Sequence, residues 1–281
     1  MAAAPRFLIL DGYPKKSRDE FDVAGMKLAG VLYADMLLKY LPDARYDLLY
    51  TSDPGAAAPD DTALAGYAGV LWPGCNLTVY RGDDPRVTIM LDICERAFEA
   101  GIPQFGTCWG IQVPSFVAGG EVKENPKGRE MGIGRCIHLT EEGKRHPMMK
   151  GKPEIYRHFV SHDDHVTRLP QGALLLAGNE FSPVQAAEIR YGKGVFWGLQ
   201  YHPEYDLFQM ARLMVAREKK LTDLGFFRGG DDFRAYVERL EALHADPSRK
   251  DLRWQLDIED DILSDDIRQC EFKNWIDTFY R

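Results

Sequence analysis

The chain has 281 residues, of which 45% are hydrophobic and 28% are charged, and its formal net charge is −8 at pH 7. This length allows one large domain or two small ones with a sizeable core, and the mixed composition excludes a disordered chain. The acidic balance argues against a nucleic-acid-binding protein.

The cysteine content and the N-terminus indicate a cytoplasmic protein. The five cysteines are odd in number and none has C-x-x-C spacing, which argues against a disulfide framework or a structural zinc site. The apolar run within residues 1–13 is too short for a signal peptide. Because no apolar run is long enough to cross a bilayer, we also expect no membrane association.

The first part of the chain alternates short apolar strands with helices. We expect strands at 6–13, 44–50, 67–76 and 102–106, and helices at 21–41, at 83–100 and from 109 onward. This alternation predicts an α/β fold with an open, mostly parallel, doubly wound sheet that has helices on both faces.

The pattern then changes to strand-like segments separated by turns, followed by helices. Gly192 and Gly194 supply the backbone angles of a predicted hairpin. Beyond Glu204 the pattern is helical, so we predict a domain over residues 1–206 and a helical C-terminal extension over 207–281. Since amphipathic helices outside a core must cover their apolar faces, we expect the extension to bind a partner or to form a homo-oligomer.

Cys108 lies in the sequence G-T-C-W-G, where a predicted strand meets a predicted helix. This is the cysteine form of a nucleophile elbow, in which a strained backbone lifts the side chain off the sheet edge. The helix that begins at Trp109 directs free N–H groups and its dipole at the sulfur, which stabilises a thiolate. An inert, packed cysteine is the alternative that this short pattern leaves open.

A nucleophilic cysteine needs a base, and Y-H-P-E offers His202 and Glu204. Residues i and i+2 of an extended segment point to the same side, so Glu204 can orient the imidazole that accepts the Cys108 proton. Taken singly, each residue also fits a junction between a strand and a helix. The elbow, the histidine and the glutamate together favour a triad.

G-x-C-x-G-x-Q followed by Y-H-P-E resembles the class I glutamine amidotransferase family, especially the glutaminase domain of GMP synthetases. L-W-P-G-C-N at 71–76 resembles the oxyanion loop of that family, and S-H-D-D at 161–164 resembles its S-H-x-D segment. The resemblance spans residues 5–206. It implies a flavodoxin-like core that hydrolyses the side-chain amide of glutamine through a γ-glutamyl thioester, without a cofactor.

The resemblance assigns roles to individual residues. Cys108 attacks the amide, His202 protonates the leaving ammonia, and Glu204 supports His202. The oxyanion hole uses the backbone N–H groups of Cys75 and Trp109. The substrate contacts implied by the motifs are Gly74, Gln112, Ser161 and His162.

Several questions stay open at this point. The segment S-H-D-D-H at 161–165 contains metal-ligand types, but no companion cluster has a recognisable spacing, so we expect no metal. The motifs include no ATP-binding loop and no synthetase domain. The enzyme therefore either supplies ammonia to a separate synthetase subunit or cleaves a related γ-glutamyl amide unaided. A DJ-1/PfpI-like hydrolase and a non-catalytic binding module on the same fold are the alternatives.

Overall fold

A computed structural model describes residues 4–281, so the first three residues of the N-terminal stretch lie outside the described residues. The strands are β1 (Arg6–Asp11), β2 (Arg45–Tyr50), β3 (Gly69–Trp72), β4 (Gln104–Thr107), β5 (Glu121–Glu124), β6 (Glu130–Leu139), β7 (Ile155–His162), β8 (Asp164–Arg168), β9 (Leu174–Gly178), β10 (Ala186–Tyr191) and β11 (Gly194–Leu199). The helices are α1 (Lys15–Ala24), α2 (Ala29–Tyr40), α3 (Asp61–Ala65), α4 (Pro85–Glu99), α5 (Trp109–Val117), α6 (Glu141–Arg145), the 3₁₀ helix η1 (Pro147–Met149), α7 (Leu207–Ala216), α8 (Glu218–Asp223), α9 (Gly230–Ala245), α10 (Lys250–Leu256), α11 (Asp260–Leu263), α12 (Asp265–Arg268) and α13 (Cys270–Tyr280). No helix in residues 4–281 combines the length and hydrophobicity that a membrane crossing requires.

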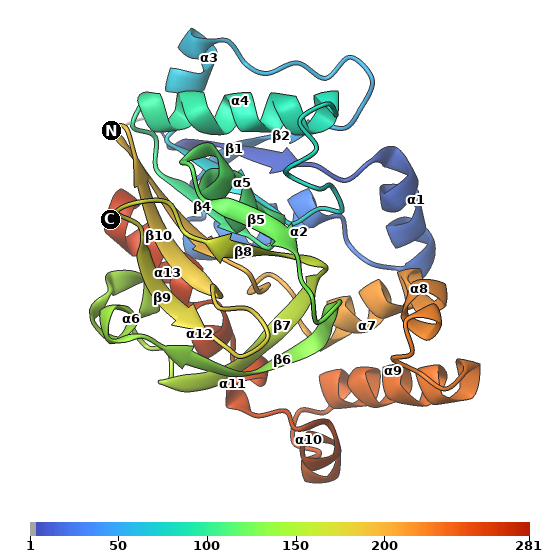
Figure 1. The fold of residues 1–281 in the computed structure, drawn as a ribbon. Helices are drawn as coiled ribbons and strands as arrows, with labels where there is room; N and C mark the ends of the chain where they lie inside the picture. The colour runs from blue at the N-terminus through green and yellow to red at the C-terminus, as the bar shows by residue number, and fades with distance from the viewer. Residues whose placement is uncertain (1–3) are drawn as a thin grey trace.

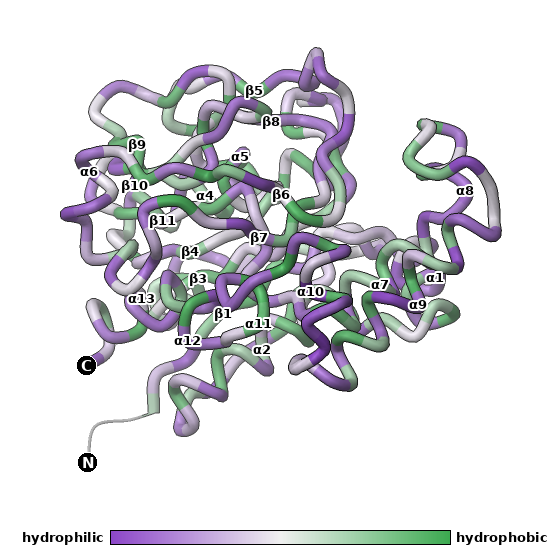
Figure 2. Tube along the Cα trace, turned by 90° about the horizontal axis from the view of Figure 1, so that it is seen from below, coloured by the Kyte–Doolittle hydropathy of each residue, from purple (hydrophilic) through white to green (hydrophobic). Residues whose placement is uncertain are grey.

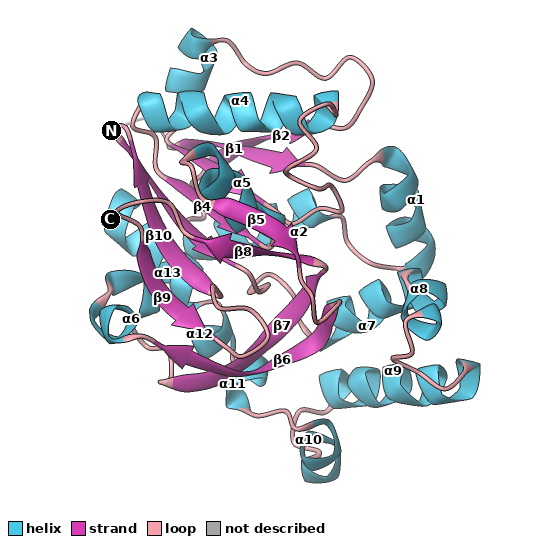
Figure 3. Ribbon diagram, in the orientation of Figure 1, coloured by secondary structure: helices cyan, strands magenta, loops and turns pink. Residues whose placement is uncertain are grey.

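A large twisted sheet forms the centre of the molecule (Figures 1 and 3). Within the described residues it has nine strands in the order β2-β1-β3-β4-β11-β10-β9-β6-β7, while β5 and β8 pair separately. Each pair of neighbours from β2 to β11 in this order is parallel, and each pair from β11 to β7 is antiparallel. The predicted doubly wound α/β fold is confirmed.

Helices cover both faces of this sheet because its strands are apolar on both sides. In β1, Leu8 and Leu10 pack into the core that contains α4 and α5, whereas Phe7 and Ile9 pack into the core that contains α2 and α13. This division follows from the two-residue period of a strand. Apolar residues accordingly concentrate in the central strands, and polar residues predominate in the outer loops (Figure 2).

Two local predictions need correction. The helix predicted at 21–41 is two helices, because Gly25 adopts a left-handed conformation with φ of 75° and ends α1. The predicted hairpin is confirmed, and Gly192 has the expected positive φ of 56°. Gly194 serves a different purpose, since a Cβ there would lie 2.7 Å from the Cα of Phe98.

The C-terminal helices pack onto the rest of the chain. On α13, the Phe272 ring lies 5.2 Å from that of Phe105, and the Trp275 ring lies 6.1 Å from that of Phe7, both distances between ring centroids. Helix α7 packs against α1 and α9. The extension buries much of its apolar surface within its own chain, but Trp254 on α10 is 85% exposed. The homo-oligomer therefore stays a prediction. The boundary at residue 206 stays a prediction.

A buried ion pair holds α13 against the sheet. The Lys152 Nζ lies 2.9 Å from Glu271 Oε1, and both side chains are 0% exposed. The same Glu271 oxygen accepts a hydrogen bond of 2.5 Å from the hydroxyl of Tyr201. The anchor therefore reaches the segment that directly precedes His202.

We expect Glu271→Ala to lower the free energy of unfolding by about 3–5 kcal/mol, because it leaves the Lys152 ammonium buried without its counter-charge. Urea unfolding measures this loss. The matched control is Asp277→Ala on the same helix, whose pairs with Lys273 and Arg281 are partly exposed and should cost less than about 1 kcal/mol. Equal losses in the two variants would contradict the anchoring role.

Candidate active site

Cys108 lies at the turn between β4 and α5 in a backbone conformation that is rare for a residue with a side chain. Its φ is 55° and its ψ is −106°, a strain that costs about 1–3 kcal/mol. The Cys108 N–H donates a 2.7 Å hydrogen bond to the Leu199 carbonyl of β11. The surrounding structure therefore holds the cysteine in the geometry of a nucleophile elbow.

The glycines that flank Cys108 are required by close packing. A Cβ at Gly106 would lie 2.7 Å from the Trp72 Cβ, and one at Gly110 would lie 2.3 Å from the Trp72 carbonyl oxygen. Real Cβ atoms do not approach other atoms so closely, so any side chain would move the elbow away from β3. The two glycines of G-x-C-x-G are therefore needed because the turn lies directly against β3.

His202 and Glu204 form a buried pair just after β11. The His202 Nδ1 lies 2.7 Å from Glu204 Oε1, and both side chains are 1% exposed. Glu204 Oε1 also accepts a 3.1 Å hydrogen bond from Thr107, which accepts one of 2.8 Å from the Tyr33 hydroxyl. The Tyr205 ring stacks on the imidazole at 4.3 Å between ring centroids. The carboxylate and the stacked ring together fix the orientation of the imidazole.

This environment favours the charged imidazole. Burial lowers the pKa of His202, but the charge of Glu204, with further contributions from Cys108, outweighs burial and raises the pKa to about 9. The ring is therefore protonated at neutral pH. A charged imidazole beside a cysteine is the arrangement that stabilises a thiolate.

Three segments distant in sequence meet at Gly74, in the loop after β3. A Cβ placed on Gly74 would lie 2.9 Å from His202 Cε1, 3.1 Å from Cys108 Cβ and 3.6 Å from Cys108 Sγ. Within residues 4–281 the His202 Nε2 makes no hydrogen bond, and the thiol points to the Ser161 carbonyl at 3.6 Å. The thiol and the imidazole thus both lie close to Gly74, although no hydrogen bond joins them among the described residues.

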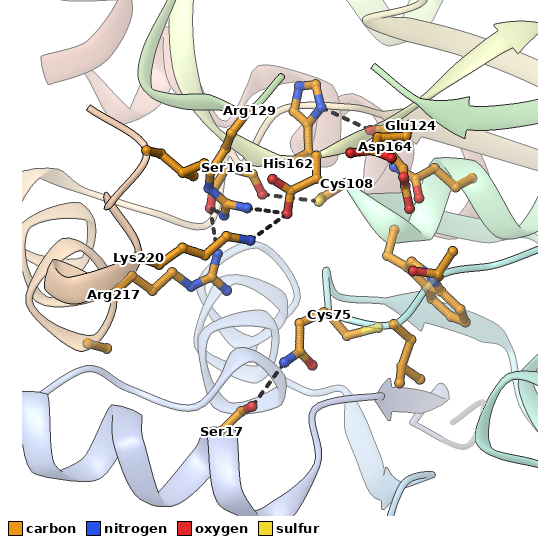
Figure 4. A pocket seen from close by; sticks show the side chains of 18 of the residues that line it. Ser17, Cys75, Cys108, Glu124, Arg129, Ser161, His162, Asp164, Arg217 and Lys220 are labelled. Atoms are coloured by element: carbon orange, nitrogen blue, oxygen red, sulfur yellow. Dashed lines mark hydrogen bonds and ion pairs between the residues drawn. The ribbon is translucent and has the colours of Figure 1, made fainter. Parts of the chain in front are cut away.

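A cavity of about 920 Å³ opens above Cys108 (Figure 4). The predicted site residues that line it are Cys75, Cys108, Trp109, Gln112, Ser161 and His162. Gln112 donates a 3.0 Å hydrogen bond to the Asp164 carbonyl, and the His162 ring lies 2.9 Å from a Glu130 carboxylate oxygen. The His162 ring is thereby held by contacts within its own chain.

The sequence alone did not indicate several residues around the site. Arg129 and Arg217 both line the cavity, and Thr107 and Tyr33 support Glu204. Arg217 lies between two helices in the basic stretch A-R-E-K-K, which has the composition of a solvated surface. No local signal distinguishes it from the neighbouring lysines.

These features agree with comparisons to known proteins. The model of the family "Glutamine amidotransferase class-I" matches residues 56–219. The chain therefore belongs to the class I glutamine amidotransferase family and is an amide-hydrolysing enzyme. The family predicted from the motifs is confirmed.

Individual relatives differ in how much of the chain they match. A γ-glutamyl-L-1-hydroxyisopropylamide hydrolase of Pseudomonas sp. is 29% identical over 275 residues, which cover 97% of this chain and 92% of that protein. The GMP synthase of Thermosipho africanus is 30% identical over 177 residues, which cover 62% of this chain and 31% of that enzyme.

Solved structures share the fold at low sequence identity. A glutamine amidotransferase from Thermotoga maritima has a TM-score of 0.68 and 19% identity, with 99% of each chain covered. One from Methylobacillus flagellatus has a TM-score of 0.63 and 19% identity, with 100% of this chain and 97% of that chain covered. Both alignments include the C-terminal helices.

The raised pKa of His202 predicts how stability depends on pH. A folded-state pKa of about 9, above the ordinary 6.5, stabilises the folded state below pH 6.5, and this contribution is lost as the pH rises through 9. The shift corresponds to roughly 3 kcal/mol. The unfolding free energy of the wild type relative to His202→Gln should therefore be largest below pH 6.5, fall between pH 6.5 and about 9, and be smallest above 9, as measured by urea unfolding. A difference that stays constant with pH would contradict the shift.

Proposed function

We propose that this enzyme hydrolyses γ-glutamyl amides, with Cys108 as the nucleophile and His202 and Glu204 as its partners. The observation that carries the proposal is the meeting of the strained Cys108 and the buried His202–Glu204 pair at Gly74. Cys108 has a strained backbone, and its thiol lies close to a charged imidazole. These are the features of a reactive cysteine rather than of a cysteine that only packs in the core.

The proposed reaction has two steps. The Cys108 thiolate bonds to the amide carbon, the carbon–nitrogen bond breaks, and His202 gives its proton to the leaving nitrogen. A water molecule then attacks the carbonyl carbon of the γ-glutamyl thioester, and His202 takes a proton from this water. The carbon–sulfur bond breaks, so the Cys108 thiolate forms again and glutamate leaves. Glu204 keeps the imidazole oriented throughout.

The proposed oxyanion hole consists of the backbone N–H groups of Cys75 and Trp109. Trp109 is the first residue of α5, where a helix N–H has no partner within the helix. Cys75 lies in the loop after β3 and lines the same cavity. Each such donor contributes about 2.7–4 kcal/mol to a developing oxyanion in comparable sites.

Two observations favour a γ-glutamyl amide larger than glutamine as the substrate. The similarity to the γ-glutamyl-L-1-hydroxyisopropylamide hydrolase includes the C-terminal extension, since it covers 97% of this chain. The cavity of about 920 Å³ is near the upper limit of ordinary ligand pockets and leaves room beyond a glutamyl group. This enzyme would act without a synthetase.

The similarity to GMP synthases supports a second candidate, in which the substrate is glutamine and the ammonia passes to a separate synthetase subunit. That similarity covers 62% of this chain and so leaves out much of the C-terminal extension. We regard the first candidate as the better supported.

We expect Cys108→Ala and Cys108→Ser to lower amide hydrolysis by roughly 10⁴-fold or more while the circular dichroism spectrum is unchanged, because only the nucleophile is removed. Hydroxylamine should trap the thioester as γ-glutamyl hydroxamate with the wild type alone. Turnover near the wild-type rate in either variant would refute the nucleophilic role.

A substrate panel distinguishes the two candidate functions. We expect the purified enzyme to hydrolyse γ-glutamyl-L-1-hydroxyisopropylamide with a kcat/KM at least about 10-fold above that for glutamine, because the larger leaving group fills more of the cavity. Weak turnover of both substrates, with glutaminase activity that rises when a synthetase is added, would favour the second candidate instead.

A further inference from the structure

Arg217 is a cation in the active-site cavity without a carboxylate partner. It lies between α7 and α8, and its Nη1 donates a 3.0 Å hydrogen bond to Ser161 Oγ while Nη2 donates one of 3.2 Å to the Tyr13 hydroxyl. Within residues 4–281 no carboxylate lies within ion-pair distance of it, although the neighbouring Lys219 and Lys220 both have one. A partly buried charge that is left unpaired costs free energy unless a ligand compensates it.

A second guanidinium converges on the same hydroxyl. Arg129, directly before β6, donates from Nη2 to Ser161 Oγ at 2.8 Å and from Nη1 to Asp163 Oδ2 at 2.6 Å. Its side chain is 3% exposed, and its Nε is buried without a partner among the described residues. Two arginines from separate parts of the chain therefore meet at Ser161 (Figure 4).

The positive charges around Ser161 outnumber the carboxylates that pair with them. Asp163 Oδ2 pairs with both Arg129 and Lys220, so one carboxylate serves two cations while Arg217 has none. Both guanidinium groups donate to the Ser161 hydroxyl, so two like charges lie close together. In line with this, burial and then the charge of Arg217 lower the pKa of Arg129. An anion bound between the two guanidinium groups would relieve their repulsion.

The other acids of the cavity do not fill this role. Within the described chain, none of the other acids that line this cavity forms an ion pair with Arg129 or Arg217; these acids are Glu20, Glu124, Asp164 and Asp223. The Asp164 carboxylate accepts a 3.1 Å hydrogen bond from the Tyr80 hydroxyl. The other acids of the cavity therefore leave Arg217 without a carboxylate partner.

Ser161 also links this positive region to the nucleophile, because its carbonyl lies 3.6 Å from Cys108 Sγ. In a γ-glutamyl group the amide carbon and the α-carboxyl carbon are four bonds apart, or about 5 Å when extended. We propose that Arg129 and Arg217 bind the α-carboxylate of the γ-glutamyl substrate, with the Ser161 hydroxyl between them. This inference rests on the proposed function, and it assigns a residue of the predicted C-terminal extension to substrate recognition.

If Arg217 binds the α-carboxylate, its removal should weaken only substrates that carry this carboxylate, and two analogues of glutamine test this. Glutaramic acid keeps the carboxylate and lacks the α-amine, whereas 4-aminobutanamide keeps the amine and lacks the carboxylate. Charged hydrogen bonds of this kind correspond to roughly 10- to 100-fold in affinity. Arg217→Ala should therefore raise KM for glutamine and glutaramic acid by this factor, with kcat less affected, and should leave kcat/KM for 4-aminobutanamide within about 3-fold of the wild type.

The control variants are Lys219→Ala, an exposed neighbour on α8, which should leave both substrates unaffected, and Arg129→Lys, which keeps the charge and tests the second arginine. If the wild type hydrolyses glutaramic acid with a kcat/KM roughly 10- to 100-fold above that for 4-aminobutanamide, the need for the carboxylate is supported directly. Equal effects of Arg217→Ala on both analogues, or no effect on glutaramic acid, would overturn the proposal.

A separate measurement tests carboxylate binding without turnover. Glutarate should bind to Cys108→Ala, and the double variant Cys108→Ala/Arg217→Ala should bind it roughly 10- to 100-fold more weakly by calorimetry. Equal affinities in the two variants would overturn the proposal. Failure of the proposed function is distinct, because the wild type would then hydrolyse no γ-glutamyl amide, or Cys108→Ala would retain activity.

Discussion

The site depends on the left-handed backbone of Cys108, which has a φ of 55°. That conformation is tolerated only because its surroundings determine it: the Leu199 carbonyl holds the Cys108 N–H, and Trp72 leaves no room for a side chain at either flanking glycine. The parallel strands β3, β4 and β11 are neighbours in the sheet. Their carboxyl ends therefore bring Gly74, Cys108 and His202 to one edge, where open α/β sheets commonly bind ligands.

The charges of the site are arranged around this edge in two groups. On one side, a glutamate in the protein interior keeps the imidazole of His202 protonated, with a pKa of about 9. On the other side, Arg129 and Arg217 meet at Ser161 with a deficit of negative charge. Cys108 lies between the His202–Glu204 pair on one side and the two arginines on the other.

The C-terminal helices are part of this arrangement. Helix α13 covers one face of the sheet and anchors the segment before His202 through Glu271 and Tyr201. The junction of α7 and α8 brings Arg217 into the cavity. The helices that follow His202 and Glu204 thus contribute both to the support of the imidazole and to the wall of the cavity at Cys108. The similarity to an amide hydrolase likewise covers 97% of this chain.

The sequence by itself determined the fold class, the elbow and the family, because strand and helix periodicity, the G-x-C-x-G turn and the Y-H-P-E segment are all encoded by residues close together in the chain. The helix predicted at 21–41 was wrong, because the helical spacing of apolar residues continues across Gly25 whereas the helical backbone conformation ends there. Only the tertiary structure decided that the extension covers its own chain and that Arg129 and Arg217 meet at Ser161. The physical reason is that charge balance and burial depend on contacts between distant segments, so a basic residue in a polar stretch has the same local sequence whether it faces solvent or a substrate.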